Sequence, residues 1–274
     1  MRVLAINDLS CVGKCSLSVS LPIISACGVT CDVLPTALLS THTGGFEGYT
    51  FRDLTGDIPD IIKHWKTLGI QFDCIYSGYL GSEEQIQAVA NIKREFLKDG
   101  GIFVIDPVMG DSGKLYAGFT DAFVDKMREL CKQADYILPN ATEACYLAGV
   151  SYPPTRENVK TILKKLSFFC PFPIITGITE GNDISVYYTQ NGNGVFSFTH
   201  ENVPGFFCGA GDVFASAFVG CLMNGRTEAQ AIYLASEFTA AAIRRSAKEV
   251  EDKRYGLNFE KEILPFLGRL RAFE

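Results

Sequence analysis

The sequence is poor in several features that mark whole classes of protein. Its 274 residues include only three histidines and one tryptophan, and no block of five charges of one sign occurs. The formal net charge is −6, so the chain lacks the basic surface with which proteins bind nucleic-acid phosphates. No apolar run approaches the roughly 18 residues of a membrane helix, and the N-terminus lacks the apolar core of a signal peptide. We therefore expect no nucleic-acid or membrane partner and a cytoplasmic location.

Paired metal-binding cysteines are also missing, although the chain has ten cysteines. Cys11 and Cys15 stand four residues apart, as do Cys27 and Cys31, and no histidine lies at ligand spacing from them. This pattern differs from the CxxC pairs of structural zinc sites. We expect reduced thiols that pack as small buried hydrophobic residues.

The sequence does contain a regular alternation of short apolar runs and amphipathic stretches. Hydrophobic residues make up 47% of the chain, which is enough for a full core. Strands are predicted at Arg2–Ile6, Gly28–Pro35, Asp73–Ser77, Ile102–Asp106, Tyr136–Pro139 and Pro173–Thr176. Helices are predicted between the first two strands and at Leu54–Leu68, Glu83–Lys98, Asp121–Lys132, Arg156–Leu166, Ala210–Asn224, Glu228–Ser246 and Glu260–Leu270. This alternation predicts an α/β protein with a mostly parallel sheet covered by helices on both faces.

An antiparallel hairpin is predicted at one end of the sheet. The runs Ile184–Thr189 and Gly194–Thr199 flank Gln190-Asn191-Gly192-Asn193, in which Asn-Gly is a typical hairpin turn. No internal repeat, low-complexity tract or Pro/Gly-rich linker interrupts the chain. We therefore expect a single domain over residues 1–274 with an antiparallel edge.

The strongest candidate site is the stretch Gly209-Ala210-Gly211-Asp212, which opens a predicted helix rich in small residues. The glycines let the backbone approach a ligand, and the helix N-terminus offers unpaired N–H groups and a positive dipole end. This combination predicts an anion hole. One role for Asp212 is to cap the helix. The other is that of a kinase base, which deprotonates the attacking hydroxyl as it approaches the γ-phosphorus.

Two further loops at predicted strand ends carry carboxylates. Asp106 and Asp111 lie in DPVMGD, after a buried strand, where carboxylates can hold Mg²⁺ directly or through water. The alternative is an ordinary loop with solvated acids. Asn140 and Glu143 have the spacing of a helix capping box, which by itself explains both residues.

Two polar, glycine-rich loops, Ser40–Phe46 and Ser77–Ser82, follow predicted strands. Their aromatic and hydroxyl side chains suit a flat, polar heteroaromatic ligand, although each loop could also be a plain turn. His42 fits a hydrogen-bonded structural residue better than a catalyst. The stretch Val12–Ser16 (VGKCS) matches a phosphate-binding P-loop only faintly, because a cysteine follows the lysine and an acid replaces the first glycine.

Taken together and in this order, the motifs THTGG, SGYLGS, DPVMGD and GAGD resemble the ribokinase superfamily and, within it, the pyridoxal kinases. The resemblance runs from Val3 to about Arg245. It implies a three-layer αβα sandwich and the transfer of the γ-phosphate of ATP to the 5′-hydroxyl of pyridoxal, pyridoxine or pyridoxamine. It also implies Mg²⁺, a monovalent cation such as K⁺, and a homodimer.

The same resemblance implies three groups of site residues. Asp212 would be the catalytic base, over an anion hole of Gly209, Ala210 and Gly211. The ATP side would comprise Asp106, Glu143, Thr176 and a flap from Asp111 to Tyr116, with Asp106 and Glu143 serving the metal. The ring pocket of the acceptor would comprise Asp8, Ser10, Thr43, Gly44 and Tyr79, with the acceptor hydroxyl pointing at Asp212.

The first strand leaves the acceptor open. Many pyridoxal kinases have a serine where Asp8 stands, and the stretch NDLS is similar to hydroxymethylpyrimidine kinases, whose loop also carries an acid. Those kinases commonly have a cysteine in place of the GAGD acid, whereas this chain has Asp212. The prediction is therefore a vitamin B6 kinase. The alternatives are a hydroxymethylpyrimidine kinase and a non-catalytic binder of pyridoxal phosphate, which would not need the base.

Overall fold

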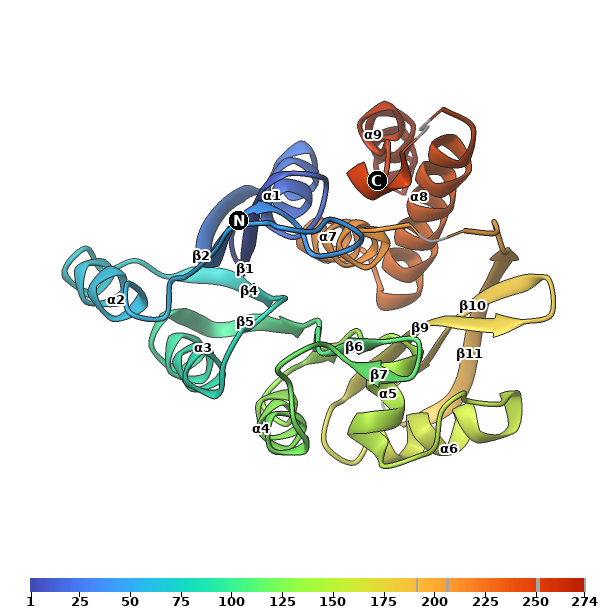
Figure 1. Cartoon of the computed structure of the whole chain (residues 1–274), viewed down its shortest axis with the longest axis horizontal. Helices are drawn as coiled ribbons and strands as arrows, with labels where there is room; N and C mark the ends of the chain where they lie inside the picture. Colours follow the sequence, from blue (N-terminus) through green and yellow to red (C-terminus); the bar gives the residue numbers. More distant parts are fainter. Residues whose placement is uncertain (191, 206, 250–251, 274) are drawn as a thin grey trace.

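The computed structural model describes residues 1–190, 192–205, 207–249 and 252–273. Helices lie on both faces of a central sheet and make three layers (Figure 1). One face is covered by α1 (Leu17–Ala26), α7 (Ala210–Met223), α8 (Glu228–Glu249) and α9 (Ile263–Arg271). The other face is covered by α2 (Ile58–Thr67), α3 (Glu83–Phe96), α4 (Asp121–Cys131), α5 (Ala141–Ala148) and α6 (Arg156–Leu166). The predicted αβα sandwich is confirmed.

The strands of the central sheet follow the order β11-β10-β9-β8-β5-β4-β1-β2-β3. Their bounds are β1 Arg2–Val12, β2 Thr30–Thr41, β3 Phe51–Asp53, β4 Phe72–Ser77, β5 Leu97–Ile105, β8 Tyr136–Ile137, β9 Phe172–Glu180, β10 Asp183–Gln190 and β11 Asn193–Glu201. The neighbouring strands in the part of the sheet with the order β9-β8-β5-β4-β1-β2 pair in parallel. The predicted hairpin β10–β11 is antiparallel, although Asn191 of its turn lies outside the described residues. The opposite edge is also antiparallel, through β3, which is too short to show a periodic pattern in the sequence.

Successive residues of β1 point into opposite layers. Val3 and Ala5 belong to the core cluster that contains α1, α7 and α8 side chains, whereas Leu4 and Ile6 belong to the cluster on the other face. All four side chains are fully buried. Because helices cover both faces, the strand reads as an unbroken apolar run rather than as an alternating one.

The first two strands run further than the sequence predicts. β1 continues past Ile6, because its backbone keeps pairing with β2 up to Val12. The pairing register shifts between Asn7 and Leu9, which places Asp8 at a β-bulge. Asp8 and Ser10 therefore lie on a strand and not in a loop, since polar side chains do not end a strand whose backbone is still paired.

The observed helices differ from the predicted ones mainly in where they begin and end. The helix predicted from Leu54 begins only at Ile58, with a proline in its first turn, where a missing N–H costs nothing. The last predicted helix divides into a 3₁₀ turn (η2, Glu260–Glu262) and α9. A further 3₁₀ turn, η1, spans Lys253–Tyr255. Among the described residues, no helix combines the length and apolar content needed to cross a membrane.

Small residues let α7 pack closely against α1. A Cβ at Gly220 would lie 2.5 Å from the Sγ atom of Cys27, at the end of α1, so the two helices meet where no larger residue fits. All ten cysteines lie in the described part of the chain and are free. Seven are buried, and Cys11 is the exposed one, with Cys15 and Cys31 between.

Candidate active site

The polar residues singled out in the sequence gather at the carboxyl edge of the parallel strands, beside the start of α7. Asp106 follows β5 directly, and its N–H donates to the carbonyl of Ser77 at the end of β4. Asn140 follows β8 and pairs with Thr176 of β9 in an isolated bridge. The carboxyl ends of parallel strands are where open α/β sheets bind their ligands.

The anion-hole residues lie at a helix N-terminus. Gly209 is the N-cap of α7 and has φ 78° and ψ 5°, in the left-handed region. A Cβ there would lie 2.2 Å from the carbonyl oxygen of Lys14, so any side chain would collide with backbone. No described side chain caps this helix. The N–H groups of its first turn are therefore available to an anion.

Asp212 lies in the first turn of α7 and is half-buried. Its Oδ1 atom accepts a hydrogen bond of 3.4 Å from Asn7 Nδ2. Burial raises the pKa of Asp212 to about 7; the charge of Asp8 adds to the rise, while the Ser16 N–H and the Asn7 amide oppose it. A carboxyl group with a pKa near neutrality can accept and release a proton at physiological pH.

Asn7 is a site residue that the sequence reasoning did not single out. It is fully buried, and its Oδ1 atom accepts hydrogen bonds from the N–H groups of Asp8 (3.0 Å) and Tyr79 (2.8 Å). A Cβ at Gly78 would lie 2.2 Å from Asn7 Nδ2. The asparagine thus ties the loop after β4 to Asp212. A buried amide in an otherwise apolar strand was the only signal in the sequence.

Asp8 is buried and held by two hydroxyl groups. Its Oδ1 accepts a 2.5 Å hydrogen bond from Ser16 Oγ, and its Oδ2 accepts one of 3.3 Å from Ser10 Oγ. Burial raises the pKa of Asp8, and the two serine hydroxyls and His42 oppose the rise. Ser10 therefore lies beside Asp8.

Asp106 is buried but its carboxylate makes no hydrogen bond to any residue in the described part of the chain. Its Oδ2 atom lies 3.9 Å from the position that a Cβ of Gly211 would take, so it faces the anion hole. Burial raises the pKa of Asp106 well above its usual range, and the charges of Glu143 and Asp212 raise it further. A carboxylate that has no hydrogen-bond partner among the described residues and lies near two other acids suits a cation.

Glu143 forms the capping box predicted for it. Its Oε2 accepts from the Asn140 N–H at 2.9 Å, while the Asn140 side chain accepts from the N–H of Glu143 at 3.0 Å. The other oxygen, Oε1, accepts from the Met109 N–H at 3.1 Å, within the DPVMGD loop. Burial raises the pKa of Glu143 to about 8 against these hydrogen bonds. The residue therefore caps α5 and also holds the neighbouring loop.

The segment from Asp111 to Tyr116 is a small hairpin made by β6 (Gly110–Asp111) and β7 (Lys114–Leu115). The Gly113 N–H donates to Thr142 Oγ1 at 2.9 Å, which ties the hairpin tip to α5. Burial raises the pKa of the Tyr116 hydroxyl, and the charges of Glu143 and the three nearby aspartates add to the rise. Asp111 itself is exposed. The hairpin thus borders the cluster of acids.

On the acceptor side, His42 organises the loop that contains Thr43 and Gly44. His42 Nδ1 accepts from the Gly44 N–H at 3.1 Å, so Nε2 carries the proton and donates to the Arg254 carbonyl at 2.6 Å. This is the structural role that the sequence predicts for His42. Thr43 is exposed. A Cβ at Gly44 would lie 2.7 Å from Cys208 Sγ, which in turn donates to the Gly44 carbonyl at 3.5 Å.

Tyr79 lies in the loop after β4, where its N–H donates to Asn7 Oδ1 at 2.8 Å. Its ring lies 5.9 Å from that of Phe119, and it is half-buried. Burial raises the pKa of Tyr79 to about 12, and the charge of Asp8 adds to the rise. Asn7 links the two residues, because its Oδ1 accepts from the N–H groups of both Asp8 and Tyr79.

A mainly apolar cleft, which also includes His200, Glu201 and Asn202, reaches Ala210, the first residue of α7. Its lining includes Ile184, Val203, Phe207, Ala210, Ala240 and Ile243. Thr176 lies outside this lining and beside Asn140, at the sheet edge. The start of α7 therefore borders both this cleft, through Ala210, and Asp106, which faces Gly211.

The described residues contain no group of three or more histidines, cysteines or acids arranged to enclose a metal ion. The acids do fit a cation that keeps most of its waters and binds mainly to phosphate, because Asp106 is unsatisfied and lies near Glu143 and Asp212. The donor set is thus compatible with Mg²⁺ that arrives with a nucleotide.

A three-layer α/β fold, a glycine-built anion hole at a helix N-terminus and a neutral-range carboxyl group define a phosphotransferase of the ribokinase type. The family model described as phosphomethylpyrimidine kinase matches residues 21–257. The chain belongs to this family, and its relatives include pyridoxal kinases.

Three relatives illustrate the likeness. A proposed phosphomethylpyrimidine kinase from Bacteroides thetaiotaomicron, crystallised in one form with pyridoxal, is 39% identical over 96% of this chain and 93% of its own, with a TM-score of 0.93 in its rhombohedral form. Pyridoxal kinase from Lactobacillus plantarum is 32% identical over 97% and 96% of the two chains, with a TM-score of 0.91. Pyridoxal kinase PdxY of Rubrobacter xylanophilus is 26% identical over 92% and 91%.

Proposed function

We propose that the protein transfers the γ-phosphate of ATP to the 5′-hydroxyl of pyridoxal, pyridoxine or pyridoxamine. The observation that carries the proposal is Asp212, a carboxyl group with a pKa of about 7 in the first turn of α7, directly after the anion hole. The similarity to pyridoxal kinases, and to a protein crystallised with pyridoxal, supports the choice of acceptor.

In this mechanism Asp212 takes the proton of the acceptor hydroxyl as its oxygen attacks the γ-phosphorus. A new O–P bond forms, the bond between the γ-phosphorus and the β,γ-bridging oxygen breaks, and ADP leaves with that oxygen. The N–H groups of Gly209, Ala210 and Gly211 face the phosphoryl oxygens and stabilise the charge that they carry in the transition state. The Asn7 amide and the Ser16 N–H orient the carboxylate of Asp212.

The position of the cleft indicates where the base of the nucleotide binds. With the phosphates over Gly209–Gly211, the base reaches the cleft lined by Phe207, Ala240 and Ile243. The hairpin from Asp111 to Tyr116 borders the phosphate region as a flap, and Thr176 contacts the nucleotide from the sheet edge. An apolar, concave surface beside an anion hole is what a purine nucleotide needs.

Asp106 and Glu143 would hold Mg²⁺, with Asp106 the better placed because both oxygens of Glu143 already accept backbone hydrogen bonds. Bound Mg²⁺ would neutralise phosphate charge, and K⁺ is proposed as the monovalent cation. The acceptor ring would lie among Asp8, Ser10, Thr43, Gly44 and Tyr79. Asp8 orients the Ser10 hydroxyl there, since the two are hydrogen-bonded.

Hydroxymethylpyrimidine is the second candidate acceptor. The family model carries the phosphomethylpyrimidine kinase description, and the acidic Asp8 in the first strand favours it. A non-catalytic binder of pyridoxal phosphate is the third candidate. The raised pKa of Asp212 argues against it, because binding alone requires no base.

We also propose a single domain over residues 1–274, a homodimer and a cytoplasmic location. One continuous sheet links strands from residue 2 to residue 201, which supports the single domain. The edge at β2 and β3 exposes Leu38, Tyr49 and Phe51, and these apolar side chains suit a second copy of the chain. Ten free cysteines suit a reducing compartment. Sedimentation velocity at micromolar concentration tests the dimer.

The test of function is ADP release from ATP, with Mg²⁺ and K⁺, offering the three vitamers and hydroxymethylpyrimidine in parallel. A kcat/KM for a vitamer at least tenfold above that for hydroxymethylpyrimidine supports the proposal. The reverse order assigns the protein to the second candidate. Binding of a vitamer by calorimetry without any ADP release would assign it to the third.

A further inference from the structure

The turn Lys14–Ser16, the faint P-loop match, makes contacts that the mechanism above does not use. The carbonyl oxygen of Lys14 lies against Gly209, where it leaves no room for a Cβ. The Sγ of Cys15 lies 3.6 Å from the same Cβ position. The turn therefore forms the wall behind the anion hole.

On its opposite side, the turn rests on a C-terminal segment. The Lys14 N–H donates to the Tyr255 carbonyl at 3.1 Å, and Lys14 and Gly256 form an isolated parallel bridge. Gly256 is buried and has φ 87°, and a Cβ there would lie 2.8 Å from the Lys14 carbonyl oxygen. The carbonyl group of Lys14 is thus enclosed between two glycines, Gly209 of the anion hole and Gly256 of the C-terminal segment.

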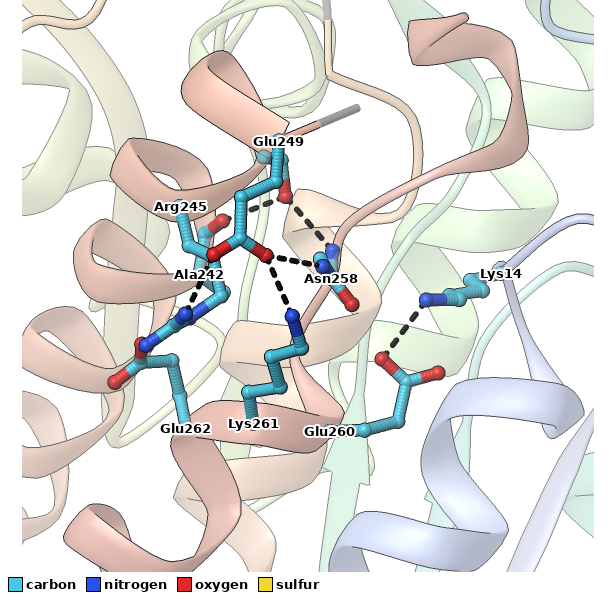
Figure 2. Close-up of polar contacts among 9 residues, drawn as sticks. Lys14, Ala242, Arg245, Glu249, Asn258, Glu260, Lys261 and Glu262 are labelled. Carbon is cyan, nitrogen blue, oxygen red and sulfur yellow. Dashed lines mark hydrogen bonds and ion pairs between the residues drawn. The ribbon is translucent and has the colours of Figure 1, made fainter. Parts of the chain in front are cut away.

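The side chain of Lys14 fastens the turn to the same segment. Its Nζ atom lies 2.8 Å from Glu260 Oε2 and 5.7 Å from the ring centre of Phe259. Figure 2 shows the ion pair of Lys14 and Glu260 on one side of the segment. The ion pair of Lys261 and Glu249 lies on the other side.

Ser16, at the end of the turn, faces both acids of the acceptor side. It is the N-cap of α1, a position at which a serine hydroxyl usually accepts a hydrogen bond from its own helix, but it makes no such bond. Its hydroxyl donates to Asp8 instead, and its N–H faces Asp212. Its φ is 56°, which is strained for a residue with a side chain.

We propose that the turn Lys14–Ser16, held by the C-terminal segment 255–260, is a positioning element for phosphoryl transfer. The turn fixes the position of the anion hole relative to the Asp212 carboxylate. Gly256 and Glu260 support the turn but contact neither of these groups. The inference rests on the proposed kinase activity. Displacing the turn misaligns groups that act in the transition state, so kcat falls while acceptor binding persists.

The first test is Gly256→Ala, which forces a Cβ against the Lys14 carbonyl. The matched control is Gly225→Ala, because Gly225 has a similar φ of 72° but no atom within 4 Å of its Cβ position. Both glycines have a positive φ, but Gly256 also has a ψ of −168°, a combination that only glycine adopts readily, so Gly256→Ala displaces the backbone of the segment 255–260 as well as contacting Lys14. We expect kcat to fall about tenfold in Gly256→Ala alone, with acceptor KM within about twofold of wild type.

A second test covers the case in which Gly256→Ala does not fold. Lys14→Glu and Glu260→Lys each break the ion pair, and we expect each to lower kcat about threefold, with recovery in the double variant. Lys66→Glu, which breaks the exposed pair with Glu95 between α2 and α3, is the control and should leave kcat unchanged.

Equal kcat values in Gly256→Ala and Gly225→Ala, beside an active wild type, would overturn the inference. So would a charge exchange that fails to restore the rate lost in the single variants. A wild type that releases no ADP with any acceptor would contradict the proposed function itself and, with it, the role of the turn.

Discussion

Two groups of acids in this molecule have opposite surroundings. Asp8, Asp106, Glu143 and Asp212 lie at the sheet edge, and burial raises the pKa of each. Within the described residues none of them forms a salt bridge. In the C-terminal cluster of Figure 2, Glu249 instead contacts Arg245 at 2.8 Å and Lys261 at 2.9 Å, and Glu262 contacts Arg245 at 2.6 Å. Hydrogen bonding by Lys261 lowers the pKa of Glu249.

The difference separates acids that stabilise the fold from acids that await a ligand. Each acid of the C-terminal cluster has its cation in the chain, so its charge is already compensated. Among the described residues, the acids at the sheet edge accept hydrogen bonds from serine hydroxyls, backbone N–H groups and the Asn7 amide, none of which carries a full positive charge. Burying such groups is unfavourable unless a metal ion or a proton joins them.

The largest effect should come from Asp212→Asn, which removes the base and keeps its shape. We expect kcat to fall on the order of 10²-fold or more, with ATP affinity largely kept. ADP release and calorimetry with a non-hydrolysable ATP analogue measure the two quantities. Turnover close to that of wild type would remove Asp212 from the mechanism.

Asp106→Asn tests the acid that has no hydrogen-bond partner in the described chain. We expect kcat/KM to fall on the order of tenfold to a hundredfold, and the Mg²⁺ concentration for half-maximal rate to rise, because a cation loses its charged partner. A titration of the rate with Mg²⁺ measures this. An unchanged Mg²⁺ dependence would show that Asp106 does not act on the metal side.

The pH dependence of kcat/KM should reflect Asp212. Its pKa is raised to about 7, so the free enzyme loses its base as the pH falls below this value. We expect kcat/KM to fall about tenfold per pH unit below pH 7 and to level off above it. Initial rates from pH 5.5 to 9 at constant ionic strength provide the profile. A rate that is flat down to pH 5.5 would contradict a base with this pKa.

The stability of the ligand-free protein should also depend on the buried acids of the sheet edge, with a smaller effect than on the rate. A carboxyl group whose folded pKa lies above its unfolded value binds protons more tightly when folded, so stability falls as the pH rises from about 4 towards 7 or 8. We expect Asp212→Asn to stabilise the ligand-free protein at pH 8 by on the order of 1 kcal/mol, a value reduced by the partial exposure of the side chain. Thermal melts at pH 5 and pH 8 compare the two proteins.

The smallest effect should come from Glu249→Gln in the C-terminal cluster. Its folded pKa lies below the unfolded value, so its contribution is present above about pH 4.5 and is lost as the pH falls through the folded pKa. The pair is exposed, and we expect Tm to fall by less than about 2 °C, with kcat unchanged. A loss of activity here would remove the distinction between the two groups of acids.

Local signals in the sequence were sufficient for much of the fold and part of the site. The capping box of Asn140 and Glu143 and the glycines before α7 depend on neighbours within four residues, and the structure has both as predicted. The structural role of His42 followed from residue type alone. The parallel order of the strands followed from their alternation with helices.

The contacts that bring the site together were beyond such reasoning. Asn7 meets Asp212 across 205 residues, and Lys14 meets Glu260 across 246. Neither partner belongs to a periodic pattern, and the shift in pairing that places Asp8 depends on β2. These contacts depend on tertiary packing, which residue spacing does not report.

The meeting of Lys14 with Glu260 has a consequence for synthesis on the ribosome. All the acids of the site have been made by residue 212, whereas the segment that packs behind the anion hole comes more than forty residues later. We expect a nascent chain to contain every catalytic group before its anion hole is supported.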